Sequence, residues 1–152
     1  VRVCAFLYVC VCVCVCMYTQ SVQHLQGEVA TLAEEVARAR EESTPLRILL
    51  DCVCGLLFEG LDLQAALQQQ QECEGGDEKA LAAEVLTRMQ GCGQEWIPSR
   101  AALEHVRVYF AESVYPEVSP HGCQRCGVLG PALFQWADAL YSLLVEEYPP
   151  SP

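Results

Sequence analysis

The sequence predicts an all-α chain, in which a long N-terminal helix with a coiled-coil seam precedes a compact bundle of about five short helices. Three observations predict this class. Apolar residues recur at helical spacing through most of the 152 residues, Pro and Gly cluster between the apolar runs, and strand-like alternation is confined to the first twenty residues. The length suits one modest domain with an appendage. We expect three parts: residues 1–20, 21–44 and 45–152.

Residues 1–20 form a low-complexity apolar run. Val9 to Cys16 reads VCVCVCVC, which a GT dinucleotide repeat would encode, so we interpret the run as an artefact of the gene model. A membrane anchor and a signal peptide are the alternatives. The apolar stretch from Val3 to Tyr18 is shorter than the roughly 20 residues of a membrane span. A signal peptide would have Arg2 as the one residue of its basic region, and no small-residue cleavage site stands out.

Residues 21–44 carry a heptad pattern. Six apolar residues at 3-4-3-4-3 spacing form the predicted seam: Val22, Leu25, Val29, Leu32, Val36 and Ala39. Strict heptad spacing favours one strand of a coiled coil over the alternative, an amphipathic helix packed on its own domain. Gly27 is the weak point, since Gly in a helix costs roughly 1 kcal/mol relative to Ala. We expect the exposed seam to make the chain self-associate.

Residues 45–152 read as short helices between breaks. Thr44-Pro45 marks the junction, because Pro disfavours helix before it and suits a first helical turn. In the last helix Leu133, Trp136 and Leu140 recur at helical spacing, and we expect Trp136, Leu140 and Tyr109 in the core. The predicted helices are Leu46–Phe58, Leu61–Leu67, Ala80–Met89, Ala101–Phe110 and Leu133–Tyr148, with a polar loop at Gln68–Lys79 and turns at Pro116–Gly130.

The charge balance disfavours several partners. The formal net charge is −11, from 9 Lys and Arg against 20 Asp and Glu. Nucleic acids and anionic lipids both require basic side chains to neutralise phosphate. We therefore expect neither nucleic-acid nor membrane binding. The 11 Cys residues are an odd number that fits a disulfide framework badly, and we interpret them as reduced thiols.

Catalytic and metal motifs are weak or missing. The sequence has no phosphate loop, nucleophile elbow or His-Glu pairing at metal spacing. His121, Cys123 and Cys126, with Cys92 as a distant fourth ligand, are a possible zinc set. One CxxC without a second paired motif favours turn and core thiols instead. We expect no catalytic residue, no metal and no cofactor.

Several short motifs follow one another in an informative order. After the heptads and Thr44-Pro45 come Ile97-Pro98, Val106-Arg107-Val108-Tyr109, Pro116-Glu117 or Pro120, Trp136-Ala137 and finally Pro152. This order resembles the stalk and microtubule-binding tip of dynein heavy chains over Val22 to Pro152. The heptads resemble the outgoing strand of the stalk, Leu46 to Phe58 the first tip helix, and the Trp136 helix the closing one.

The resemblance implies a mechanical element, not an enzyme, since the family's ATPase modules would lie outside this stretch. It implies tubulin and other dynein subunits as partners, in the cytoplasmic cytoskeleton or the ciliary axoneme. The family grips acidic tubulin through basic residues; the candidates here are Arg47, Arg100, Arg107 and Arg125. The last helix instead ends in Glu146 and Glu147, so we expect weakened or lost track binding. The alternative is a membrane-anchored or scaffold coiled-coil interaction protein that binds no track.

Overall fold

A computed structural model describes residues 16, 18–41, 45–74, 78–92, 95–111 and 115–148. Within these ranges the secondary structure is helical, apart from turns and an isolated bridge between Cys92 and Trp96. The predicted all-α class is confirmed. Most of the apolar run at residues 1–20 lies outside the described residues, so its interpretation stays a prediction.

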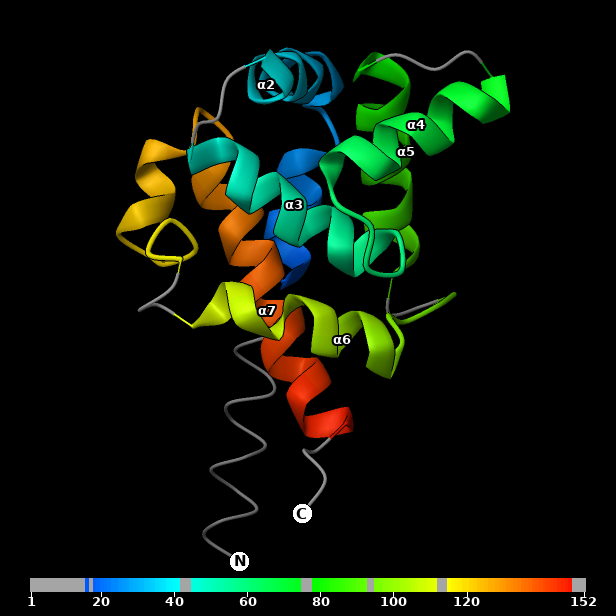
Figure 1. Cartoon of the computed structure of the whole chain (residues 1–152). Coiled ribbons are helices and arrows are strands. Elements are labelled where there is room, and N and C mark those ends of the chain that lie inside the picture. Colours follow the sequence, from blue (N-terminus) through cyan, green and yellow to red (C-terminus); the bar gives the residue numbers. More distant parts are fainter. Residues whose placement is uncertain are drawn as a thin grey trace, which may run out of the picture.

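The helices pack as a single bundle around α3 (Figure 1). They are a helix that includes residues 18–25, then α2 (Val29–Glu41), α3 (Pro45–Leu57), α4 (Leu63–Glu74), α5 (Glu78–Gly91), α6 (Arg100–Val106), the 3-10 helices η1 (Arg107–Phe110) and η2 (Gly122–Arg125), and α7 (Gly130–Glu147). Among the described helices, none combines the length and the apolar character that a membrane span requires.

The predicted long N-terminal helix is divided in two at Gly27. Residues 26 and 27 form a turn, and the Glu28 N–H donates to the Leu25 carbonyl at 3.0 Å. A residue of the turn also makes a tertiary hydrogen bond: the Gln26 side-chain amide donates to the Leu86 carbonyl of α5 at 3.0 Å. The prediction of one continuous N-terminal helix is therefore wrong. The break lies at Gly27, the residue that weakens a helix.

The heptad residues face the chain's own core. Leu25, Leu32, Val36 and Ala39 are at most 1% exposed, and Val22 and Val29 pack against the same core. Helix α2 packs chiefly along α5, with a surface ion pair of 2.8 Å between Arg40 and Glu78. The exposed seam that we expected is thus wrong for the described chain. The open alternative, an amphipathic helix packed on its own domain, describes the observed packing.

Helix α3 is the central element because nine of its thirteen residues are buried. It contacts α2, α4, α5, α6, η2 and α7. Its sequence, PLRILLDCVCGLL, is apolar on nearly every face, as a helix covered on most sides must be. Cys52 and Cys54 lie within it and are buried.

Helix α4 extends further than the sequence predicted. It runs from Leu63 to Glu74 and so includes much of the polar stretch that we expected to be a loop. Gln and Glu are good helix formers, which makes a polar helix possible there. The Asp62 carboxylate caps its start by accepting the Ala65 N–H at 2.8 Å.

Helix α7 forms the C-terminal side of the bundle. It begins at Gly130, with Pro131 in its first turn, where Pro is favourable. Trp136 and Leu140 are buried along its length, whereas Tyr109 of η1 is partly buried and packs against the core. The structure thus places these three expected core residues around the same apolar interior.

Candidate functional site

The first described helix and α7 meet at an aromatic contact. The Tyr18 and Trp136 ring centroids are 6.1 Å apart, and the Trp136 side chain is fully buried. The Tyr18 hydroxyl donates to the Cys92 carbonyl at 3.0 Å, beyond the end of α5. Figure 1 shows the chain rising through this helix while α7 descends. The first described helix and α7 are therefore antiparallel neighbours.

The four candidate arginines lie on separate segments. Arg47 is on α3, Arg100 opens α6, Arg107 opens η1 and Arg125 ends η2. Of these segments, α6 contacts both α3 and η1, and η2 contacts α3. The structure therefore places the four residues on different segments and not along a single helix face: Arg47 lies in the first turn of α3, whereas the Ser99 hydroxyl, beside Arg100, donates to Glu59 past the other end of α3.

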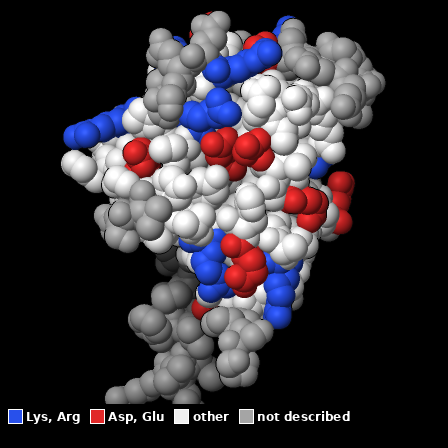
Figure 2. All heavy atoms as spheres, viewed as in Figure 1, with Lys and Arg blue, Asp and Glu red and all other residues white. Residues whose placement is uncertain are grey.

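Three of these arginines have partners within the chain. Arg47 Nε lies 3.5 Å from Asp51 Oδ1, and Arg107 Nη2 lies 3.0 Å from Glu104 Oε1. The Arg100 guanidinium lies 5.8 Å from the centre of the Tyr148 ring. Figure 2 shows basic and acidic side chains mixed on the viewed face. The positive charges of Arg47 and Arg107 are therefore offset by the carboxylates beside them.

A buried carboxylate that the sequence did not single out joins α2 to the start of α7. Glu35 is 1% exposed, and its Oε1 accepts the Leu129 N–H at 3.0 Å. Its Oε2 has no hydrogen-bond partner among the residues that the structure describes. Gly127, with φ of +82°, leaves the space, because a Cβ there would lie 2.6 Å from Glu35 Oε1. A carboxylate at a helix N-terminus is favoured by the helix dipole.

The environment of Glu35 disfavours its charge despite this contact. Burial raises the pKa of Glu35, while hydrogen bonds from the Leu129 and Val128 N–H groups and the charge of Arg38 oppose that rise. A carboxyl group whose pKa is higher in the folded state binds more protons there than in the unfolded state. Its contribution to stability therefore falls as pH rises from the ordinary glutamate pKa of about 4.3 through the folded-state value.

We predict that Glu35→Gln flattens part of the pH dependence of stability. Gln retains an acceptor for the Leu129 N–H but carries no buried charge. The free energy of unfolding of E35Q relative to the wild type should be highest near pH 7 and should decline as pH falls toward about 4.3. Urea unfolding at several pH values measures this difference. Glu34→Gln, which removes an exposed carboxylate from the same helix, is the control; equal profiles for E34Q and E35Q would contradict the role of burial.

The residues considered as a possible zinc set do not form one cluster within the described part of the chain. Cys92 directly follows the end of α5, Cys123 and Cys126 are buried around η2, and His121 is exposed. No group of three or more His, Cys, Asp or Glu side chains arranged to hold a metal occurs in the part of the chain that the structure describes. Burial raises the pKa of the Cys126 thiol to about 11, which keeps it protonated near neutral pH and makes it a poor ligand or nucleophile.

Comparison with known proteins does not assign this chain to a family or a fold. No protein-family model matches the sequence, and neither the curated proteins nor the solved structures contain a match. A function for this chain therefore has to be argued from its own residues and contacts.

Proposed function

We propose that this chain is a dynein-like stalk tip whose grip on the microtubule is weak. The proposal begins from the order of motifs in the sequence. The helix over residues 18–25 and α2 correspond to the end of the outgoing strand, α3 to the first tip helix, and α7 to the closing helix. The single observation that carries it is the packing of Tyr18 against the buried Trp136.

That contact supports a tip because of what a stalk requires. A domain at the end of two antiparallel strands must receive the chain and return it at the same side. The antiparallel course of the first described helix and α7 meets this requirement (Figure 1). The mechanical coupling would pass through buried contacts, of which the Glu35 link between α2 and Leu129 is one. The seam residues of α2 pack against the chain's own core and α5, so the coiled-coil stalk and the pairing with a returning strand rest on the order of motifs alone.

Weak binding follows from the charges. Tubulin is acidic, so binding depends on cations, and this chain carries a net charge of −11. Its Arg47 and Arg107 each lie beside a carboxylate. Both arginines are partly exposed, with 29% and 35% of the side-chain surface accessible. At such exposure an ion pair contributes only about 0–1 kcal/mol, so an acidic surface can compete for the arginine.

Co-sedimentation of the 152-residue chain with microtubules tests the proposal. We predict binding at low ionic strength that is lost near 0.15 M salt, where the screening length is about 8 Å. Glu104→Gln should raise the bound fraction, because it frees Arg107. Glu84→Gln is the matched control: it also removes one negative charge beside an arginine, Arg88, but on α5. Equal effects would indicate net charge alone, and no sedimentation of wild type or E104Q at low salt would overturn track binding.

A further inference from the structure

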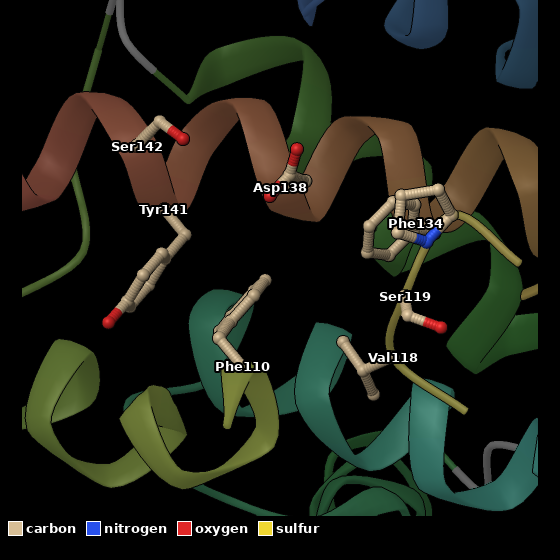
Figure 3. Close-up of a pocket in the computed structure, with 8 residues that line it drawn as sticks. Phe110, Val118, Ser119, Phe134, Asp138, Tyr141 and Ser142 are labelled. Atoms are coloured by element: carbon tan, nitrogen blue, oxygen red, sulfur yellow. The ribbon is translucent and has the colours of Figure 1, made fainter. Parts of the chain in front are cut away.

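A small pocket lies between α7 and the segments around Phe110 and Val118. Its volume is about 270 Å³, and its lining includes Phe110, Val118, Pro120, Phe134, Asp138 and Tyr141. Figure 3 shows Phe110 below the gap, Phe134 and Tyr141 at its two ends, and Asp138 on the helix above it. Pockets for drug-sized ligands measure roughly 300–1,000 Å³. This one is of a size to hold a single side chain.

Aromatic rings form most of the apolar wall. The Phe110 and Tyr141 rings are stacked, with centroids 4.1 Å apart and planes inclined by 13°. Phe134 is only 8% exposed, which holds its ring in place. Aromatic faces carry negative electrostatic potential and attract cations. The two stacked rings come from η1 and α7, so the wall exists only in the folded chain.

Asp138 adds a negative charge to the pocket. Within the described residues its carboxylate forms no hydrogen bond and no ion pair, although the residue is half-buried. Desolvation by burial raises the pKa of Asp138. The nearby Ser119 hydroxyl is engaged elsewhere, since it donates to the Pro116 carbonyl at 2.6 Å and accepts the Gly122 N–H at 2.9 Å. No Lys or Arg is among the described residues that line the pocket.

We propose that this pocket binds the cationic side chain, Lys or Arg, of a protein partner. A cation placed there meets the carboxylate of Asp138 and the aromatic wall together, in a site that is partly withdrawn from water. Charged hydrogen bonds and cation–π contacts both strengthen when they are desolvated. The net charge of −11 also attracts basic partners over a longer range. This inference does not depend on the stalk proposal.

Peptide titration followed by aromatic ¹H–¹³C NMR tests the inference on the whole chain. The probes are acetyl-Gly-Lys-Gly-amide and acetyl-Gly-Arg-Gly-amide, with acetyl-Gly-Gln-Gly-amide as the neutral control. We expect saturable shifts of the Phe110 and Tyr141 signals with at least one cationic peptide and none with the Gln peptide. Equal shifts with all three peptides, or shifts reproduced by sodium chloride alone, would overturn the proposal. So would binding of n-butylammonium without binding of either cationic peptide.

Asp138→Asn separates the charge from the shape of the pocket. We expect it to weaken binding of the cationic peptide about tenfold, since the amide is of similar size but uncharged. Glu146→Gln is the matched control, because it removes an exposed acid from the same helix and should leave the affinity unchanged. Thermal unfolding by circular dichroism establishes that both variants fold. A folded D138N with wild-type affinity would contradict the proposed role of the carboxylate.

Discussion

Replacing Trp136 by Ala should lower the free energy of unfolding by about 3–5 kcal/mol, the usual cost of deleting a fully buried aromatic side chain. Trp136 is 0% exposed and is the largest of the fully buried side chains. Its loss removes apolar burial and leaves a cavity that the bundle can fill only in part. Because Tyr18 packs on this ring, the first described helix should loosen with it. In thermal unfolding the midpoint should fall by roughly 10 °C.

Trp96 provides the matched control, since it is the other of the chain's two Trp residues and is only partly buried. Trp96→Ala should lower the free energy of unfolding clearly less than Trp136→Ala does. The tryptophan fluorescence of W96A then comes from Trp136 alone and should report its apolar surroundings. Trp136→Phe keeps an aromatic ring beside Tyr18 and should recover part of the lost stability. Equal destabilisation by W136A and W96A would contradict the central position of Trp136 and remove the contact that carries the proposed function.

The sequence predicts the helices best where periodicity and breaks agree. The apolar run of α3 follows Thr44-Pro45, and α3 begins at Pro45. Likewise, Pro98-Ser99 precedes α6, and Ser99 caps that helix through its hydroxyl, which accepts the Ala102 N–H at 3.2 Å. These signals are local: a missing N–H, a restricted φ angle and a side-chain acceptor each act within a few residues.

Sequence reasoning failed where distant residues decide the outcome. A heptad stripe is the same whether it faces a second strand or its own domain, and here α5 covers it. Glu35 flanks that stripe and looks like a solvent-exposed acid, yet it is buried against Leu129, 94 positions away. The pocket around Asp138 likewise requires Phe110 to meet Tyr141. No local pattern encodes such contacts, because they arise only when the helices pack.

The second large effect should come from Gly122→Ala, which we expect to destabilise the fold by about 2–3 kcal/mol, as overpacking does in a closely packed site. A Cβ at Gly122 would overlap the Pro116 carbonyl oxygen and lie 2.9 Å from Glu117 Cα. Both contacts are with backbone, so no side chain can move aside. The turn closed by the Gly122 N–H to Ser119 Oγ bond would have to open, which would displace Val118 from the pocket.

Gly27→Ala is the control for this prediction because a Cβ there would meet nothing within 4 Å. Ala also loses less conformational entropy on folding than Gly, so G27A should leave stability unchanged or raise it by up to ~1 kcal/mol. Urea unfolding of the two variants measures both effects under identical conditions. If G122A were as stable as G27A, the turn from Pro116 to Gly122 could not be packed as the structure shows. The pocket wall that this turn supplies, and with it the proposed cation site, would then lose its basis.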